Sequence, residues 1–206
     1  MKIVGLTGSI AMGKSTAAAM LRRLGVPVHD ADATVHRLMG PGGAALPAIA
    51  EAFPGAVVGG RVDRTVLGAQ VFGDAAALAR LEAILHPLVH GETHTWLRRQ
   101  ALAGRPLVVL DIPLLFEAGR DRVCDAVLVV SAPARVQRQR MLARPGMTED
   151  RLDAVLSRQL GDGEKRRRAD FVIPTGLGKG VTFRAIQRIL EALEEWPARH
   201  WPPPRP

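Results

Sequence analysis

Short, almost uninterrupted aliphatic runs recur along the chain and alternate with helical patterns. The runs cover residues 2–7, 26–29, 107–110, 126–130 and 171–173. Near-continuous apolar strands are typical of a parallel sheet that is covered on both faces. Between them, Lys14–Leu24 has a helical pattern that Gly25 ends, and Thr182–Leu193 places Phe183, Ile186, Ile189, Leu190 and Leu193 on one side. The alternation predicts a doubly wound, three-layer α/β/α fold around a five-stranded parallel sheet.

Two stretches do not fit simple alternation. Residues 33–105 are far longer than one crossover and have a mostly helical pattern. Residues 135–168 break at Pro145-Gly146 and restart at Thr148, an N-cap residue followed by two acids. We therefore predict a core of residues 1–32, 106–134 and 169–195 with two insertions. The end, residues 196–206, contains three consecutive prolines that cannot continue a helix, and we expect a flexible Pro-rich tail.

The composition is that of a globular protein in a reducing compartment. The chain has 206 residues, 47% of them hydrophobic and 23% charged. Its one cysteine, Cys124, has no intrachain disulfide partner, so we expect a cytoplasmic protein. No apolar run reaches the roughly 18 residues of a membrane helix. Lys14 and three glycines interrupt the apolar start, which argues against a secretory signal.

Positive charge is concentrated in one segment. The net charge is +8, and residues 135–168 hold ten of the Lys and Arg residues against five Asp and Glu. Such a patch attracts nucleic acid, anionic lipid or phosphorylated metabolites. With no Tyr, five Phe and three Trp, the chain has few aromatic side chains on which single-stranded bases could stack. We therefore expect no nucleic-acid or membrane partner.

The most specific motif is Gly8-Ser9-Ile10-Ala11-Met12-Gly13-Lys14-Ser15, which matches the phosphate-binding pattern G-x-x-x-x-G-K-[ST]. It falls between a predicted strand and a predicted helix, so backbone N–H groups and the positive end of the helix face a bound anion. Lys14 would reach the β- and γ-phosphates, and the Ser15 hydroxyl would bind Mg²⁺. The alternative is a chance Gly-rich turn between strand and helix.

Ala11 lies where many such loops have glycine. If the position requires a positive φ, alanine there costs about 1 kcal/mol. Contacts between the loop and phosphate would have to offset that cost.

Three carboxylates follow predicted strands. Asp111 ends the strand 107–110 and could hold a water on Mg²⁺, or could be a simple turn aspartate. Asp30 and Asp32 follow the second strand, at the carboxyl edge where open α/β sheets bind ligands. We favour a general base for Asp32 and a helix cap for Asp30. Which of the three contacts Mg²⁺ directly is left open.

Arg140 and Arg144 are four residues apart and share a helix face, where they could bind phosphate oxygens during transfer. A solvated helix face is the alternative for most residues of this patch. His86, His90 and His94 also recur every four residues, but Pro87 interrupts the stripe and H-E-x-x-H is absent. We favour a helix beside an anionic ligand over a metal site, with His86 as its candidate.

Over most of its length the chain resembles the dephospho-CoA kinase family. The resemblance rests on Gly5-Leu6-Thr7-Gly8, Asp30-Ala31-Asp32, Val62-Asp63-Arg64, Leu81-Glu82 with His86-Pro87, Asp111-Ile112-Pro113-Leu114-Leu115-Phe116-Glu117, Arg158-Gln159, Lys165 and Ala169-Asp170-Phe171-Val172-Ile173. The His-Pro pair and the Asp111–Glu117 run are specific, whereas the phosphate loop alone would indicate only an NTPase. The chain departs from the family at Ala11, which replaces a usual glycine, and at Pro145, where an aspartate is common.

The resemblance implies a nucleotide-kinase-like core, a helical CoA-binding insertion (33–105) and an arginine-bearing lid (135–168). It implies transfer of the γ-phosphate of ATP, with Mg²⁺, to the ribose 3′-hydroxyl of dephospho-CoA. Lys14, Asp32 and Arg140 would be catalytic, with Asp32 as the base. The other implied residues are, for ATP, Gly8, Ala11, Met12, Gly13, Lys14, Ser15, Thr16 and Arg144; for the acceptor, Asp32, Arg64, His86, Asp111 and Leu115; and for the metal, Ser15 and Asp111.

Two rival functions stay open. One is another small-molecule kinase of the same build, acting on a nucleoside monophosphate or a sugar acid. The other is an ATP-gated RNA-binding module that uses the arginine patch. A GTP switch is disfavoured because the chain has no Asn for an N-K-x-D guanine motif. We expect a monomer or a weak homo-oligomer.

Overall fold

The computed structural model describes residues 1–157 and 159–202 and divides into two compact units. Unit 1 contains Met1–His29 and the chain from Gln100 onward, and unit 2 contains Asp30–Arg99. Each unit has its own hydrophobic core. The functional division into nucleotide core, acceptor domain and lid stays a prediction.

A five-stranded parallel sheet forms the centre of unit 1, which confirms the predicted fold class. Its strands are β1 (Lys2–Thr7), β2 (Val28–Asp30), β5 (Leu107–Asp111), β6 (Ala126–Ser131) and β7 (Phe171–Pro174), in the order β2-β5-β1-β6-β7. β1 is central, and Leu6 is in register with Asp111 on one side and Leu128 on the other. The carboxyl end of β1 leads directly into the Gly8 loop.

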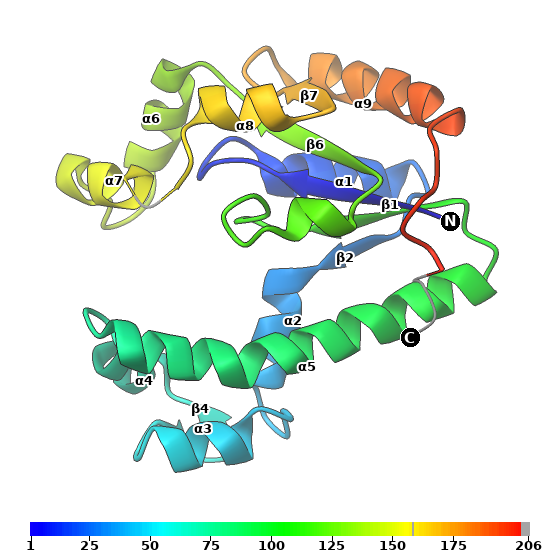
Figure 1. Ribbon diagram of the computed structural model, residues 1–206. Coiled ribbons are helices and arrows are strands. Elements are labelled where there is room, and N and C mark those ends of the chain that lie inside the picture. The colour runs from blue at the N-terminus through cyan, green and yellow to red at the C-terminus, as the bar shows by residue number, and fades with distance from the viewer. Residues whose placement is uncertain (158, 203–206) are drawn as a thin grey trace. The chain divides into compact units, whose positions relative to one another are not determined.

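Alternate residues of β1 face two different layers. Val4 and Leu6 pack against α1 (Lys14–Arg23) and α9 (Lys179–Glu194), which lie together on one face (Figure 1). Gly5 faces the opposite way, where an added Cβ would lie 2.9 Å from Leu115 Cδ2 and 3.0 Å from Cys124 Sγ. This tight contact explains why the position requires glycine.

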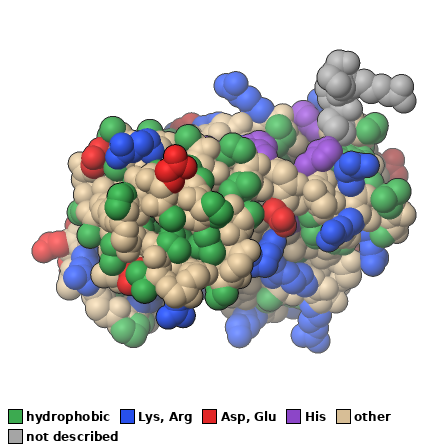
Figure 2. Space-filling model, turned by 90° about the horizontal axis from the view of Figure 1, so that it is seen from below, with side chains coloured by type: hydrophobic (Ala, Val, Ile, Leu, Met, Phe, Trp, Pro, Cys, Tyr) green, Lys and Arg blue, Asp and Glu red, His purple; other side chains and the backbone are tan. Residues whose placement is uncertain are grey.

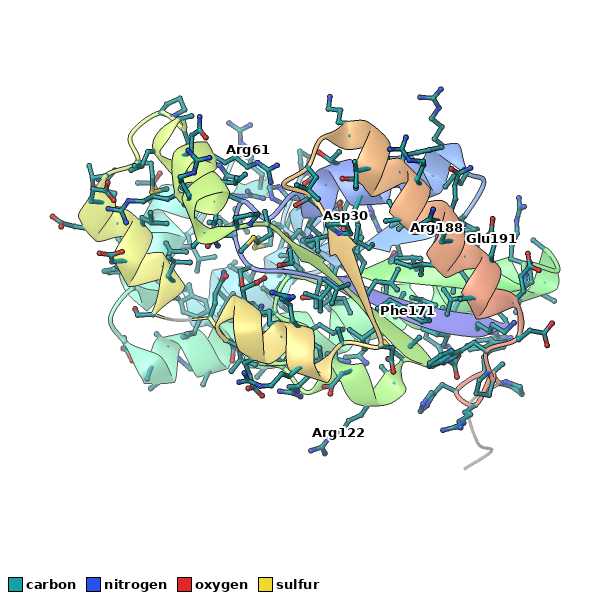
Figure 3. The ribbon with its side chains drawn as sticks, turned by 90° about the horizontal axis from the view of Figure 1, so that it is seen from above. Asp30, Arg61, Arg122, Phe171, Arg188 and Glu191 are labelled. Carbon is teal, nitrogen blue, oxygen red and sulfur yellow. The ribbon has the colours of Figure 1, made fainter. Side chains whose placement is uncertain are left out.

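The predicted apolar side of α9 is confirmed. Ile186, Ile189 and Leu193 are buried against the sheet, while Arg188 and Glu191 are exposed. Figure 3 shows these two charged residues on α9, alongside β7 with Phe171. The alternation of buried and exposed positions is that of an amphipathic helix on a sheet.

The described residues of the segment 135–168 form three helices, the first of which begins at Ala134. They are α6 (Ala134–Leu142), α7 (Glu149–Leu156) and α8 (Asp162–Arg168). α6 and α7 are separated at Pro145-Gly146, as predicted, and the Thr148 hydroxyl caps α7 by accepting from the N–H of Arg151 at 3.3 Å. Arg138 of α6 forms an ion pair with Glu149 of α7. A short helix, η1 (Arg120–Val123), precedes β6.

Unit 2 is mostly helical around a small core. Its elements are α2 (Ala31–Leu38), α3 (Leu46–Ala52), β3 (Val57–Val58), β4 (Arg61–Val62), α4 (Arg64–Val71) and α5 (Ala75–Leu102). Phe53 and Ile49 are fully buried at its centre. Pro87 lies inside α5, which nonetheless continues as one helix (Figure 1).

The β3–β4 hairpin was not predicted. Its two strands pair antiparallel, with Val57 opposite Val62. Gly59 and Gly60 join them with φ values of 57° and 74°, as a tight hairpin turn requires. A Gly-Gly pair between two short runs that contain valine is a hairpin signal, so the sequence does contain this information.

The predicted frayed tail is wrong for its first residues. The Trp196 indole N–H donates to the Asp125 carbonyl oxygen at 2.7 Å, and its ring lies 5.2 Å from that of Phe171. The Asp125 carboxylate accepts from the backbone N–H groups of Arg199 and His200. These bonds tie residues 196–200 to unit 1. Residues 203–206, with the last prolines, lie outside the described residues.

None of the helices in the described part of the chain is long and apolar enough to cross a membrane. Figure 2 shows charged side chains interspersed with hydrophobic ones on the face that it presents.

Candidate active site

Residues 8–16 connect the central strand β1 to the first turn of α1. The two glycines of the motif are needed at their positions for different physical reasons. A Cβ on Gly8 would lie 2.8 Å from the Val130 carbonyl oxygen, so any side chain would force the loop away from β6. Gly13 has φ 91° and is the N-cap of α1, a left-handed conformation that glycine adopts without strain. Both glycines therefore fix the shape of the loop.

Ala11 has φ 59°, which confirms the positive φ considered for this position. Among the described residues it is the one residue other than glycine with a positive φ. The cost relative to glycine is about 1 kcal/mol. The loop therefore holds a strained backbone conformation at its centre.

The first turn of α1 presents a set of N–H groups suited to an anion. The amides of Lys14, Ser15 and Thr16 have no intrahelical carbonyl to bond, and no side chain caps the helix. The helix dipole adds positive potential at the same end. Ser15 and Thr16 are exposed and Lys14 is partly exposed. This arrangement can bind a polyphosphate.

Lys14 and Asp111 meet beside this turn. The Lys14 ammonium lies 2.5 Å from Asp111 Oδ1, and the side chains are 18% and 4% exposed. Asp111 is the last residue of β5, and Lys14 begins α1 shortly after β1 ends. Because β1 and β5 are neighbours in the sheet, the two side chains come together at its carboxyl edge. The Asp111 carboxylate and the Ser15 hydroxyl are hard oxygen donors of the kind that Mg²⁺ prefers, so these residues fit a magnesium ion.

No cluster of three or more His, Cys, Asp or Glu side chains suited to a metal ion occurs within residues 1–157 and 159–202. His86, His90 and His94 on α5 do not form such a cluster. His86 is exposed one residue before Pro87.

The structure brings Arg140 of α6 to the phosphate loop. Its guanidinium donates to the carbonyl oxygen of Thr175 at 2.6 Å and to that of Ala11 at 3.3 Å. Arg144 is exposed, two residues after the end of α6. The two arginines of the predicted pair thus have different environments, with Arg140 bonded to the loop and Arg144 open to solvent.

A second set of contacts joins the loop to the end of the 135–168 segment. The Ile10 N–H donates to Gln159 Oε1 at 3.1 Å, and the Ser9 hydroxyl donates to the Leu160 carbonyl oxygen at 3.4 Å. The Leu160 N–H in turn donates to Glu117 Oε1 at 2.9 Å. Arg158, the other residue of the Arg-Gln motif, lies outside the described residues.

Glu117 also forms an ion pair at 2.9 Å with Lys165, whose side chain is fully buried. Burial raises the pKa of Glu117, but the bonds from Lys165 and from the Leu160 N–H outweigh it and hold the net pKa below its ordinary value. Glu117 is therefore ionised at neutral pH and partners the buried ammonium.

Unit 2 carries the remaining predicted residues. Asp30 caps α2 by accepting from the N–H of Ala33 at 2.9 Å, which confirms its interpretation as a cap. Asp32 lies in the first turn of the same helix and is exposed. Arg64 begins α4, and its guanidinium contacts both ring nitrogens of His36, with 3.1 Å between Nη1 and Nε2.

The Leu115 side chain does not fit its predicted role as a substrate contact. It is fully buried and packs against Gly5 in the core of unit 1. Its neighbour Leu114 is 43% exposed. The Asp111–Phe116 run is tied to β1 by the Thr7 hydroxyl, which donates to the Pro113 carbonyl oxygen at 2.8 Å.

Cys124 is not suited to nucleophilic chemistry. Burial, and then the nearby carboxylates of Asp125, Asp121 and Asp170, raise the pKa of its thiol to about 12. The thiol is therefore protonated at neutral pH and belongs to the core.

Two residues of the loop's surroundings were missed by sequence reasoning. Gln137 and Thr175 are buried polar residues that donate hydrogen bonds to Ile10 and Met12. Gln137 is three residues before Arg140 and so shares its helix face, and Thr175 follows β7 at the carboxyl edge of the sheet. These positions, on the helix face of Arg140 and at the carboxyl edge of the sheet, are the sequence signals that point to the two residues.

Known proteins match this chain over most of its length. The family model of dephospho-CoA kinase matches residues 2–177. A dephospho-CoA kinase of Paramagnetospirillum magneticum is 68% identical over 166 residues, which are 81% of this chain and 78% of the relative. One of Mesorhizobium japonicum is 56% identical over 94% of this chain and 97% of the relative.

A solved structure agrees with these matches. The crystal structure of TT1252 from Thermus thermophilus is 38% identical, with a TM-score of 0.82 over 93% of this chain and 97% of that one. The sequence matches, and a fold shared with this solved relative, lead to one conclusion. The chain belongs to the dephospho-CoA kinase family.

Proposed function

We propose that the protein transfers the γ-phosphate of ATP to the ribose 3′-hydroxyl of dephospho-CoA, giving CoA and ADP. The family membership supports the acceptor. The observation that carries the proposal is the loop itself, in which Lys14, the free first turn of α1 and the buried Asp111 converge after the central strand. This is the arrangement that phosphoryl transfer needs for a triphosphate.

ATP would bind along residues 8–16. The amides of Ala11 and of residues 13–16 would bond the phosphate oxygens, and the Lys14 ammonium would neutralise the β- and γ-phosphates. Arg140 would add positive charge beside the loop, and the exposed Arg144 would bind phosphate oxygens when the 135–168 segment closes. Closure excludes water, which would otherwise hydrolyse ATP.

Ser15 and Asp111 would hold Mg²⁺, which supplies charge neutralisation for the phosphoryl oxygens when bound. Before ATP binds, Asp111 also compensates the charge of Lys14. Because a lysine that binds a triphosphate has a new anionic partner, the Asp111 carboxylate then becomes available to the metal and its waters.

Asp32 would orient the acceptor hydroxyl and take its proton. The ribose oxygen then forms a bond to the γ-phosphorus, and the bond from that phosphorus to the β,γ-bridging oxygen breaks. Arg64 and His86, both exposed in unit 2, would bind the acceptor. Leu115 would act only by holding the Asp111 run in the core, since its side chain is fully buried.

The direct test is release of ADP from ATP and Mg²⁺ with a panel of acceptors. Dephospho-CoA should give rapid release, and nucleoside monophosphates and sugar acids should give little. Digestion of the product should locate the new phosphate at the ribose 3′ position. Rapid turnover with another acceptor and none with dephospho-CoA would reject the proposal.

Three further expectations belong to the same proposal: a cytoplasmic location, a monomer or weak homo-oligomer, and no nucleic-acid partner. Salt-sensitive RNA binding without acceptor-dependent turnover would favour the rival RNA-binding module instead.

A further inference from the structure

Three consecutive carbonyl groups of the phosphate loop each accept a hydrogen bond from a side chain outside the loop. Gln137 Nε2 donates to the Ile10 oxygen at 2.9 Å. Arg140 Nη1 donates to the Ala11 oxygen at 3.3 Å, and the Thr175 hydroxyl donates to the Met12 oxygen at 2.5 Å. We call Gln137, Arg140 and Thr175 the brace.

Peptide geometry gives these bonds a consequence for ligand binding. In a trans peptide, the carbonyl and the following N–H point in opposite directions. Holding the Ile10 and Met12 carbonyls outward therefore directs the N–H groups of Ala11 and Gly13 to the other side of the backbone. The Ala11 carbonyl belongs to the same peptide group as the Met12 N–H. That N–H donates to the Ser9 carbonyl oxygen at 3.1 Å and closes the turn. The brace thus orients the amides that face a bound phosphate.

The brace is itself fixed in place. Gln137 and Thr175 are both 7% exposed. The Thr175 N–H donates to the Ser131 carbonyl oxygen at 2.8 Å, at the end of β6. Arg140 bonds the Thr175 carbonyl oxygen as well as Ala11, so the members from α6 and from the chain after β7 are joined. Buried, interconnected donors lose little side-chain freedom when they bond the loop.

The strain at Ala11 gives the brace a particular task in this chain. With φ 59°, alanine favours rotation out of the left-handed region, which would turn the neighbouring amides away. The three bonded carbonyls belong to Ala11 and to the residues on either side of it. Any such rotation would have to break at least one of these bonds.

We propose that Gln137 and Thr175, with Arg140, are positioning residues that hold the phosphate loop in its anion-binding conformation and offset the strain at Ala11. This proposal rests on the proposed binding of ATP by the loop. It does not depend on the identity of the acceptor, because ATP binding can be measured without one.

The principal test compares Thr175→Val, which removes the hydroxyl and keeps the shape, with Thr175→Ser, which restores the hydroxyl. Loss of one buried bond of this kind should weaken ATP binding about tenfold, measured by calorimetry without acceptor. In turnover, the KM for ATP should rise by a similar factor while the KM for dephospho-CoA stays within twofold. Thr175→Ser should recover most of the affinity.

The chain offers a matched control at Thr182, another buried threonine. Its hydroxyl donates to the Pro174 carbonyl oxygen at 2.8 Å, outside the loop. Thr182→Val should lower the Tm about as much as Thr175→Val and leave ATP affinity unchanged. If both variants weaken ATP binding equally, or if folded Thr175→Val binds ATP within twofold of the wild type, the proposal is overturned.

Two more variants keep the test decisive. Gln137→Met removes a second donor from α6 and replaces Thr175→Val if that protein fails to fold; it should also raise the KM for ATP. In an Ala11→Gly background the Thr175→Val penalty should fall to about threefold or less, because glycine adopts positive φ without strain. An equal penalty in both backgrounds would contradict the assignment of the brace to the Ala11 turn.

The two proposals fail in different ways. A wild-type protein that binds ATP but does not phosphorylate dephospho-CoA would refute the proposed acceptor. Unchanged ATP affinity in the brace variants would refute the brace.

Discussion

The phosphate loop of unit 1 and the helix starts of unit 2 are both held by side chains that bond the backbone, but over very different distances in sequence. Ile10, Ala11 and Met12 are bonded by residues 127, 129 and 163 positions away. In unit 2, the aspartates that begin α2, α4 and α5 bond amides two or three positions away. The loop depends on the complete fold, and the caps depend only on their own segments.

This difference in sequence separation predicts two different responses to substitution. A cap that fails frays one helix, because its partners are its immediate neighbours. A long-range contact that fails changes a site to which several elements contribute. We therefore expect substitutions around the loop to affect ATP use strongly, and substitutions of caps in unit 2 to have small effects on stability.

Lys14→Ala should give the largest effect. Removing the ammonium takes away the side-chain cation of the loop and leaves the buried Asp111 carboxylate without this partner. Turnover should fall by about a thousandfold, and ATP affinity should weaken as well. Steady-state kinetics and calorimetry measure the two effects. Lys179→Ala, at an exposed position in α9, is the control and should behave as wild type; unchanged kinetics for Lys14→Ala would reject its assignment.

Glu117→Ala tests a long-range contact for stability. It leaves the fully buried Lys165 ammonium without its carboxylate, so the free energy of unfolding should fall by about 3 kcal/mol in urea titration. Glu164→Ala removes an exposed pair with Arg167 on one helix and should cost less than about 0.5 kcal/mol. Similar losses in both variants would show that burial of the pair does not matter.

The Glu117 contribution should also depend on pH. Because the pKa of Glu117 is lowered in the folded protein, its stabilisation is present above the ordinary glutamate pKa of about 4.3. It is lost as the pH falls through the lower folded-state pKa. The stability difference between wild type and Glu117→Ala should therefore shrink below about pH 4.

Asp32 differs from the capping aspartates of unit 2. It lies in α2, which is capped by Asp30 of the same segment, but it has a proposed role in the reaction. Asp32→Asn should lower kcat by at least about a hundredfold while ATP binding is kept. Its matched control is Asp30→Asn two residues earlier, where asparagine still caps α2 and activity should be near normal. Full activity in Asp32→Asn would remove it as the base.

Apart from the control variants, Asp74→Ala should have the smallest effect. The Asp74 carboxylate accepts from the N–H groups of Ala76 and Ala77 at the start of α5, and these bonds lower its pKa. Its loss should reduce the Tm by about 2–4 °C without changing turnover, and Asp74→Asn should retain the wild-type value. A large loss of activity in Asp74→Ala would blur the distinction between the two regions.

The same distinction explains which features could be predicted from the sequence. The strands, the loop and the Thr148 and Asp30 caps follow from local patterns, and the positive φ of Ala11 follows from the motif. The burial of Leu115 does not, because it depends on the close approach of β1 at Gly5. The attachment of Trp196 to Asp125 likewise joins residues 71 positions apart.

The residues that bond the loop also cannot be predicted from local patterns, because they are far from the loop in sequence. Gln137 looks like any polar residue of an arginine-rich helix until the fold places its amide 2.9 Å from Ile10. The ion pair of Glu117 with Lys165 is another example, because no sequence pattern links a residue after β5 with one in α8. By contrast, the Gly59-Gly60 hairpin is a local feature, because its two strands are separated by only two residues.

The position of the triphosphate of bound ATP tests most directly whether residues 8–16 are the phosphate-binding loop. A crystal structure with a non-hydrolysable ATP analogue and Mg²⁺ would answer it. We expect the β- and γ-phosphates against the amides of Ala11 and of residues 13–16, with the Lys14 ammonium moved from Asp111 to a phosphate oxygen and the brace bonds retained. An analogue bound at another surface, with residues 8–16 making no phosphate contact, would contradict the account.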